Sequence, residues 1–242
     1  LHKALKQAVL IGYLRTNPTE SCILPRIIRK EMHPLEEDQV AVFLREVQGH
    51  PHEYLYKIAL FTGLREGEVL GLGWEHIDFQ AGTLTVKRQL RREQKKGGEY
   101  YFSPPKNNKS RCLTLAPSVI QLFRLQKLEQ NSMRMEAGDA WEEHGLIFTN
   151  QTGGYLSYRT VYDCFKRIVR NIGAPATRFH DLRHSCASLL LANGVPMKQI
   201  QEWLGHSDFS TTANIYAHLD YASKLSSAQA MLEGLGYGNA SA

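Results

Sequence analysis

Two imidazoles, a guanidinium and a phenol occur within 37 residues of one another near the C-terminal end of this 242-residue chain. They are His180 and Arg183 in the segment His-Asp-Leu-Arg, His206 after Leu-Gly, and Tyr216 ten residues later. A phenol has a pKa of about 10 and attacks phosphate poorly at neutral pH unless cations favour its ionised form. The four side chains therefore predict phosphate chemistry with a tyrosine nucleophile.

Two cations further upstream fit the same chemistry. Arg65 lies in the segment Thr-Gly-Leu-Arg-Glu-Gly-Glu, and Lys106 lies in Pro-Pro-Lys-Asn-Asn-Lys-Ser-Arg. A guanidinium presents a fork that matches two phosphate oxygens, so Arg65 and Arg183 are expected to bind one phosphate together. Glu68, three residues after Arg65, is expected to hold the Arg65 side chain in place.

The order of these motifs resembles the tyrosine recombinase (phage integrase) family from residue 34 to about residue 225. The basic segment before the lysine looks most like that of integrases of conjugative transposons and Gram-positive phages. The resemblance implies a transesterification without metal, nucleotide or other cofactor, which leaves a 3′-phosphotyrosyl protein and a free 5′-hydroxyl. It also implies these roles: Tyr216 as nucleophile, Arg65, Arg183 and His206 as donors to the attacked phosphate, His180 in proton transfer, Lys106 as general acid, and Glu68 as support.

Three of these assignments have competitors in the sequence. His180 and His184 are four residues apart and could bind zinc, but no Glu lies between them and no third ligand is apparent, so His184 is expected to be structural. Lys109 competes for the role of general acid, because the resembled family usually has threonine after this lysine and this chain has asparagine. Tyr221 is the local competitor for the nucleophile, although it falls outside the family pattern.

Positive charge is concentrated in residues 87–111. This segment has nine Lys or Arg against two Glu, a net charge of +7, whereas the whole chain has +5 and the remainder therefore −2. Three aromatic residues at 100–102 are interleaved with the charges, which favours a DNA-contacting hairpin over a merely solvated face. The candidate DNA-binding residues are Lys87, Arg88, Arg91, Arg92, Lys95, Lys96, Lys109 and Arg111.

Composition limits where the chain works. No apolar run approaches the 18 or so residues that span a bilayer, and the N-terminus lacks the pattern of a secretion signal. The four cysteines are far apart and contain no Cys-x-x-Cys, which disfavours a disulfide framework and a zinc ribbon. We expect reduced thiols in a cytoplasmic protein without a membrane partner.

Apolar periodicity predicts a mainly helical fold with one small antiparallel sheet, the tyrosine recombinase catalytic fold by resemblance. Strand-like alternation covers residues 83–90, 100–102 and 112–115, with glycines at 97 and 98 as the turn. Helices are expected at 36–49, 52–63, directly after residue 65, and at 119–130, 158–171, 180–193, 196–204 and from 210 onward.

Four parts of the chain are expected to act differently. Residues 1–15 are predicted to be the last helix of a truncated core-binding domain, residues 16–33 an interdomain linker, and residues 34–219 the catalytic domain. Residues 220–242 carry an apolar stripe at helical spacing, which predicts a helix that docks on a neighbouring subunit, with folding back on its own core as the alternative.

The predicted function is that of a site-specific recombinase, an integrase or transposase of a mobile element. Its partner would be double-stranded DNA at attachment or transposon-end sites, and two to four copies of the chain would assemble there. DNA relaxation by a type IB topoisomerase uses the same chemistry, and a noncatalytic DNA-binding protein would use the helix-turn-helix pattern at 196–219. A metal-dependent nuclease would need clustered carboxylates, and no acidic triad is apparent.

Overall fold

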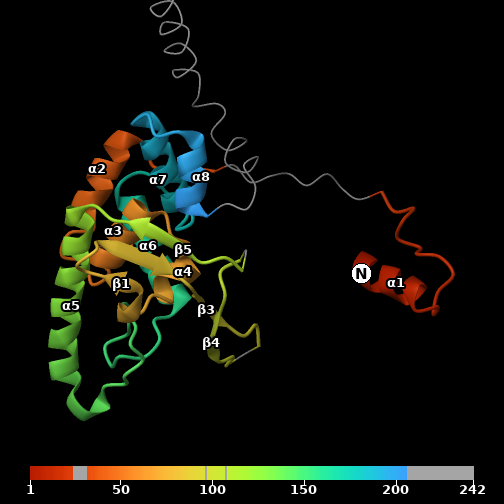
Figure 1. Cartoon of the computed structure of the whole chain (residues 1–242), viewed down its shortest axis with the longest axis horizontal. Coiled ribbons are helices and arrows are strands. Elements are labelled where there is room, and N and C mark those ends of the chain that lie inside the picture. The colour runs from red at the N-terminus through yellow and green to blue at the C-terminus, as the bar shows by residue number, and fades with distance from the viewer. Residues whose placement is uncertain (24–31, 96, 107, 206–242) are drawn as a thin grey trace, which may run out of the picture. The chain divides into compact units, whose positions relative to one another are not determined.

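The computed structural model describes residues 1–23, 32–95, 97–106 and 108–205. The chain divides into two compact units, Leu1–Glu31 and Met32–Ala242 (Figure 1). The helix expected from residue 210 and the C-terminal helix lie outside the described residues. In the part of the chain that is described, no helix is long and apolar enough to cross a membrane.

The first unit contains helix α1 (His2–Leu10) and a turn that folds back on it. The helix is shorter than the predicted segment 1–15, because Gly12 adopts a left-handed φ of 81° and the chain leaves the helix there. The Asn17 side chain donates to the His2 carbonyl, and its Oδ1 accepts from the backbone and hydroxyl of Thr19. These bonds hold the turn against the start of the helix.

The second unit is mainly helical, as predicted, and α3 is its centre. Helices α5 and α7 pack against α3. Tyr56 of α3 belongs to a cluster of aromatic rings in edge-on or tilted contact, whose other members are Phe43, Phe165 and Phe179. The helices are α2 (Glu37–Glu46), α3 (Glu53–Thr62), α4 (Glu66–Leu70), α5 (Pro117–Ala137), α6 (Tyr158–Asn171), α7 (Asp181–Ala192) and α8 (Met197–Leu204), with 3₁₀ turns η1 (Trp74–His76) and η2 (Gly138–Ala140).

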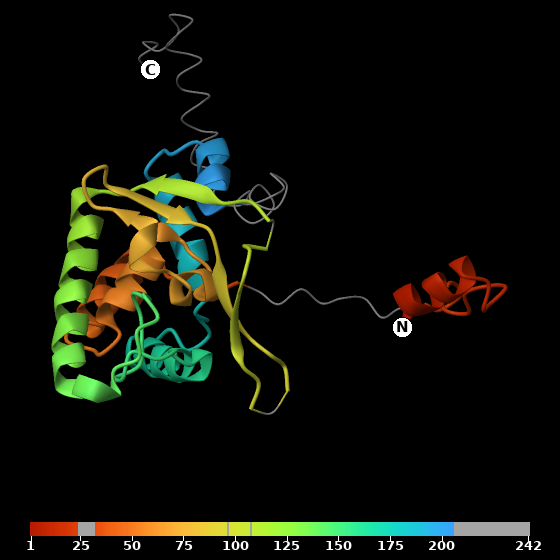
Figure 2. The ribbon, with the colours of Figure 1, turned by 60° about the horizontal axis from the view of Figure 1, so that its bottom comes forward.

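Among the described residues of this unit, two antiparallel sheets take the place of the single sheet that was predicted. One has the strand order β1-β2-β5, and the other is the hairpin β3–β4, which projects beyond the helices in Figure 2. The segment predicted as one strand at 83–90 breaks at Lys87 and Arg88, where the Arg88 guanidinium binds the Gly71 carbonyl and Glu75 instead. The strands are β1 (Ile77–Asp78), β2 (Thr83–Val86), β3 (Gln89–Arg92), β4 (Tyr100–Ser103) and β5 (Arg111–Thr114).

The start of the second unit is fastened to the α7 region. The Leu35 backbone N–H donates to Ser185 Oγ at 2.8 Å, and the Thr177 hydroxyl donates to the His33 carbonyl at 3.0 Å. The Ser185 hydroxyl in turn donates to the Asp181 carbonyl. The first residues of the unit therefore help to fix the helix that carries the His-x-x-Arg motif.

Candidate active site

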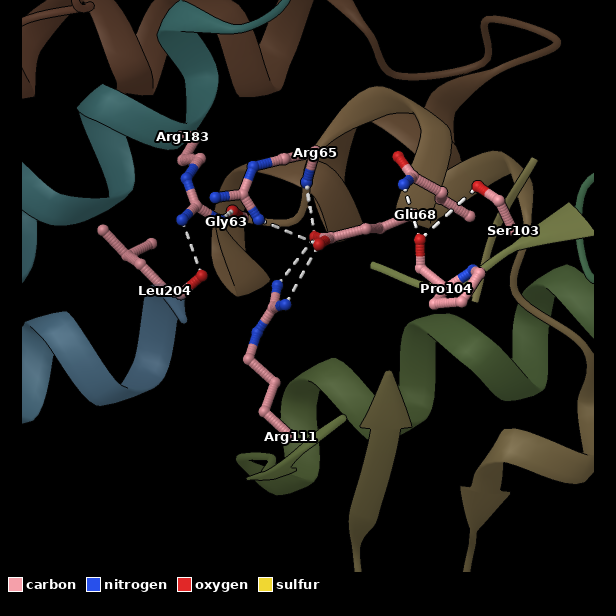
Figure 3. A network of polar contacts seen from close by, with 9 residues as sticks. Gly63, Arg65, Glu68, Ser103, Pro104, Arg111, Arg183 and Leu204 are labelled. Atoms are coloured by element: carbon pink, nitrogen blue, oxygen red, sulfur yellow. Dashed lines mark hydrogen bonds and ion pairs between the residues drawn. The ribbon is translucent and has the colours of Figure 1, made fainter. Parts of the chain in front are cut away.

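The candidate site is built around one buried carboxylate, Glu68 on α4 (Figure 3). Its Oε1 accepts from Arg65 Nη1 and Arg111 Nη1, both at 3.0 Å. Its Oε2 accepts from Arg111 Nη2 at 2.7 Å and from the Arg65 backbone N–H at 3.0 Å. Each oxygen therefore has two donors, and the carboxylate fixes both the backbone and the guanidinium of Arg65.

Glu68 stays ionised although its side chain is fully buried. Burial alone would raise its pKa, but the hydrogen bonds and charge of Arg111, with the backbone N–H and charge of Arg65, lower that pKa to about 2. Two guanidinium groups surround this single carboxylate, so the group keeps a net positive charge. Such a charge is suited to holding a phosphodiester.

Arg183 on α7 lies buried between the ends of two other helices. Its Nη1 donates to the Gly63 carbonyl at 2.7 Å, and its Nη2 donates to the Leu204 carbonyl at 2.6 Å. Gly63 caps the end of α3 and Leu204 is the last residue of α8, where the carbonyls carry the partial negative charge of the helix dipole. The guanidinium is thus held in place by main-chain groups, and it points toward Arg65 in Figure 3.

The histidines at the start of α7 are in ring contact. The His180 and His184 ring centroids are 5.1 Å apart, with the planes at 85°. Burial lowers the pKa of His180, and the charges of Arg183 and Arg65 lower it further. Burial also lowers the pKa of His184, to about 4. Near neutral pH His180 is therefore an uncharged imidazole that can accept a proton.

Asp181 fixes the turn that carries His180. It accepts hydrogen bonds from the backbone N–H, Nε and Nη2 of Arg178 at 2.8–2.9 Å. Burial would raise the pKa of Asp181, but these bonds and the charge of Arg178 lower it.

Across residues 1–23, 32–95, 97–106 and 108–205, no three His, Cys, Asp or Glu side chains are grouped as a metal site would require.

Both candidate general acids lie in the connection between β4 and β5. Lys106 follows the buried Pro105, Lys109 lies three residues further on, and both are exposed. Asn108 has a φ of 54°, and its backbone N–H donates to the Pro105 carbonyl at 2.8 Å. The tight turn thus presents both lysines to solvent.

One face of the β3–β4 hairpin packs on the body of the unit. The Arg88 guanidinium lies 4.1 Å from the Phe102 ring centroid, and that of Arg92 lies 5.3 Å from Tyr100. Tyr100 stacks in turn on Tyr155, with ring centroids 5.0 Å apart. Arg88 and Arg92 therefore stabilise the hairpin through cation–π contacts, a role that the charge pattern did not predict.

The opposite face of the hairpin is open. Arg91 and Tyr101 are cross-strand partners, both exposed, and strand alternation directs them away from the face that carries Arg92 and Tyr100. Lys87 and Lys95 are also exposed. A cation and an aromatic ring side by side on a protruding hairpin form a surface suited to a nucleic acid.

Arg111 was predicted to contact DNA, but its side chain lies against Glu68. Its side chain is only 10% exposed, and both terminal nitrogens bind Glu68. The pair joins positions 43 residues apart, so no local sequence pattern could have indicated it. The structure makes Arg111 a second support for the Arg65–Glu68 pair.

Three of the candidate residues, His206, Tyr216 and Lys96, lie outside the described part of the chain, as does the competitor Tyr221. Gly205, the residue before His206, closes α8 in a left-handed conformation with a φ of 68°. What the structure brings together is Arg65, Arg183 and His180, with Glu68 and Arg111 in support. All four cysteines are free thiols.

Comparison with known proteins assigns the chain to a family. The model of the phage integrase family matches residues 33–223, which is most of the chain. The chain therefore belongs to the phage integrase family, and the resemblance seen in the sequence is confirmed.

The relatives carry the names of recombinases and integrases. A "Tyrosine recombinase XerC-like" protein of Caldanaerobacter subterraneus subsp. tengcongensis is 32% identical over 228 residues, 88% of this chain and 58% of that protein. An integrase of Streptomyces ambofaciens is 30% identical over 227 residues, 89% of this chain and 57% of that protein. The chain thus spans somewhat more than half the length of these relatives.

Solved structures share the fold. The Tn1549 transposon integrase, in complex with transposon right end DNA, matches 97% of this chain and 76% of its own, with a TM-score of 0.75 and 25% identity. The XerH site-specific recombinase, bound to a palindromic difH substrate, matches 83% of this chain and 53% of its own, with a TM-score of 0.61 and 24% identity. The fold is that of the tyrosine recombinase catalytic domain, as predicted.

Proposed function

We propose that this chain is the catalytic part of a site-specific recombinase, an integrase or transposase of a mobile element acting on double-stranded DNA in the cytoplasm. The observation that carries the proposal is the convergence of Arg65 and Arg183, each immobilised, beside the neutral His180. The names of the relatives and the transposon-end DNA bound by the Tn1549 integrase support the same function.

The proposed reaction exchanges one phosphodiester for another. The phenolic oxygen of Tyr216 forms a bond to phosphorus, and the bond to the 5′-oxygen breaks as Lys106 supplies its proton. Arg65, Arg183 and His206 donate to the nonbridging oxygens, so the charge that develops meets preorganised donors. The 3′-phosphotyrosyl ester conserves the phosphodiester, and the hydroxyl of a partner strand can reverse the step without a nucleotide or metal.

His180 is proposed to assist proton transfer between the phosphate and the tyrosine. Its lowered pKa favours the neutral ring, which can accept a proton near pH 7. The hydrogen bonds between Arg178 and Asp181 fix the turn on which His180 lies. His184 is proposed to pack beside it as a structural residue.

The exposed face of the hairpin is proposed to bind the DNA backbone. Arg91, Lys87 and Lys95 provide accessible charge there, and Lys96 and Lys109 are proposed to add to it. Arg88 and Arg92 hold the hairpin in shape through their aromatic contacts. Phosphate neutralisation of this kind makes binding strongly dependent on salt.

Assembly on DNA is proposed to use the ends of the chain. Residues 1–15 would belong to a core-binding domain, residues 16–33 would link it to the catalytic domain at 34–219, and residues 220–242 would dock on a neighbouring copy. Truncation after Asp220 should then weaken cooperative assembly on paired sites while single-site binding persists. Loss of melting stability with cooperativity intact would favour folding back instead.

The direct test is a covalent adduct. The protein is incubated with nicked candidate attachment-site DNA in the presence of a metal chelator, and the mixture is denatured before electrophoresis. We expect an adduct with the unchanged protein and none with Tyr216→Phe, which should still bind DNA. Relaxation of supercoiled DNA without strand exchange would favour a topoisomerase, and binding without an adduct would favour a noncatalytic DNA-binding protein.

A further inference from the structure

The C-terminal end of α3 is capped by side chains from two other helices. Trp203 Nε1 on α8 donates to the Thr62 carbonyl at 3.1 Å, and Arg183 Nη1 on α7 donates to the next carbonyl, that of Gly63, at 2.7 Å. The last carbonyls of an α-helix have no partners within the helix, so these bonds satisfy groups that would otherwise need water. Each bond also ties a separate helix to the segment that leads into Arg65.

The end of α8 lies directly on the end of α3. A Cβ atom at Gly63 would come within 2.5 Å of Leu204 Cδ2, so a larger residue would require the Leu204 side chain to move, and the φ of 63° favours glycine as well. The Leu204 carbonyl accepts from Arg183 Nη2 at 2.6 Å. Hydrogen bonds from Trp203 and Arg183 therefore connect α3, α7 and α8.

We infer that Trp203 is a positioning residue for the phosphate-binding Arg183. Its indole N–H fixes α8 against α3, so that Arg183 can span the carbonyls of Gly63 and Leu204. The Arg65 guanidinium is held separately, by Glu68, so the placement of α8 bears on Arg183 alone. This inference rests on the proposed function and adds a residue to it.

Trp74 offers a matched control within the same chain. Its Nε1 donates to Gln130 Oε1 at 2.8 Å, and its ring is partly buried against the core, as the Trp203 ring is. Trp74 lies on η1, and its ring contacts Gln130 and Lys127 of α5 and stacks on Phe79, so the contacts of the ring include none of the arginines of the site. Replacing either tryptophan with phenylalanine removes one indole N–H and keeps an aromatic ring.

The experiment compares Trp203→Phe with Trp74→Phe at a temperature where circular dichroism shows both variants fully folded. The rate of covalent adduct formation is measured in a single turnover with saturating nicked attachment-site DNA. Trp203→Phe should slow the rate roughly threefold to tenfold, the range that corresponds to one hydrogen bond of ordinary strength, while Trp74→Phe keeps the unchanged rate. Cleavage of a substrate with a 5′-phosphorothiolate, whose sulfur leaves without a proton, should be slowed equally because Arg183 acts on the phosphate.

A second variant separates positioning from general weakening. If Trp203 acts through Arg183, the double variant Trp203→Phe/Arg183→Lys should be no slower than Arg183→Lys alone. Multiplication of the two effects, or cleavage by Trp203→Phe at the unchanged rate, would overturn the inference. Absence of any adduct with the unchanged protein would instead overturn the proposed function, so the two failures are distinguishable.

Discussion

The Glu68 network and the β3–β4 hairpin hold their cations in opposite ways. In the network Arg65 and Arg111 share a fully buried carboxylate, whereas on the hairpin Arg91 is exposed to solvent. Breaking a buried charge pair is costly, so its geometry is rigid, while exposed charges are screened and can rearrange. Chemistry at a phosphate needs donors in fixed positions, and binding of a DNA backbone needs mainly nearby charge.

The largest effect on the cleavage rate should come from replacing Lys106, which follows the hairpin, because this lysine takes part in the chemistry. Lys106→Ala should slow cleavage of normal DNA by about 10²- to 10⁴-fold, the range for a general acid. Cleavage of a 5′-phosphorothiolate substrate should be affected far less. Equal slowing of both substrates would exclude Lys106 from this role, and Lys109→Ala on the same pair of substrates provides the matched control.

Arg183→Lys should have the second largest effect on the cleavage rate. We expect the single-turnover rate to fall by about 10²- to 10³-fold, which is the loss observed when a preorganised donor is removed. Lysine keeps the charge but lacks the planar fork that spans the Gly63 and Leu204 carbonyls. Arg91→Lys on the hairpin should leave the rate unchanged. Cleavage by Arg183→Lys at the unchanged rate would show that the rigid placement of this guanidinium is not needed.

Glu68→Gln should destabilise the fold by about 3–5 kcal/mol, because it leaves two guanidinium groups without their buried counter-charge. The pKa of Glu68 is lowered from 4.5 to about 2, so the ionised carboxylate stabilises the folded state most fully above pH 4.5. This contribution should disappear as the pH falls from about 4.5 through about 2. Acid unfolding curves of the two proteins should therefore converge in that range, and a constant separation would contradict the assignment.

The smallest effect on the cleavage step should come from the exposed charges of the hairpin. Replacing Lys87, Arg91, Lys95 and Lys96 with glutamine should flatten the plot of log K against log salt by about 3 to 4 units, at roughly 0.9 for each phosphate that is no longer neutralised. The cleavage rate at saturating DNA should change little. Arg91→Gln alone should leave the melting temperature unchanged, whereas Arg92→Gln should lower it because glutamine cannot make the cation–π interaction with Tyr100. An unchanged salt slope would mean that these charges are only solvated.

The sequence predicted the features that depend on local spacing. Gly63 at the end of α3 and the acid three residues after Arg65 are visible as a left-handed cap and as neighbours on one helical turn. Arg111 and Trp203 reach their partners across 43 and 141 residues, and no periodicity carries that information. The aromatic contacts of Arg88 and Arg92 were missed for a related reason, since a run of charges does not show which face of a strand packs inward.

Attack on the phosphate by Tyr216 can be tested directly by mapping the covalent linkage. The covalent complex with nicked attachment-site DNA is digested with protease and nuclease, and the peptide that retains a nucleotide is sequenced by mass spectrometry. We expect a single modified peptide with the nucleotide on Tyr216, joined through the 3′-phosphate. A nucleotide on Tyr221 or on any other residue, or one joined through a 5′-phosphate, would contradict it.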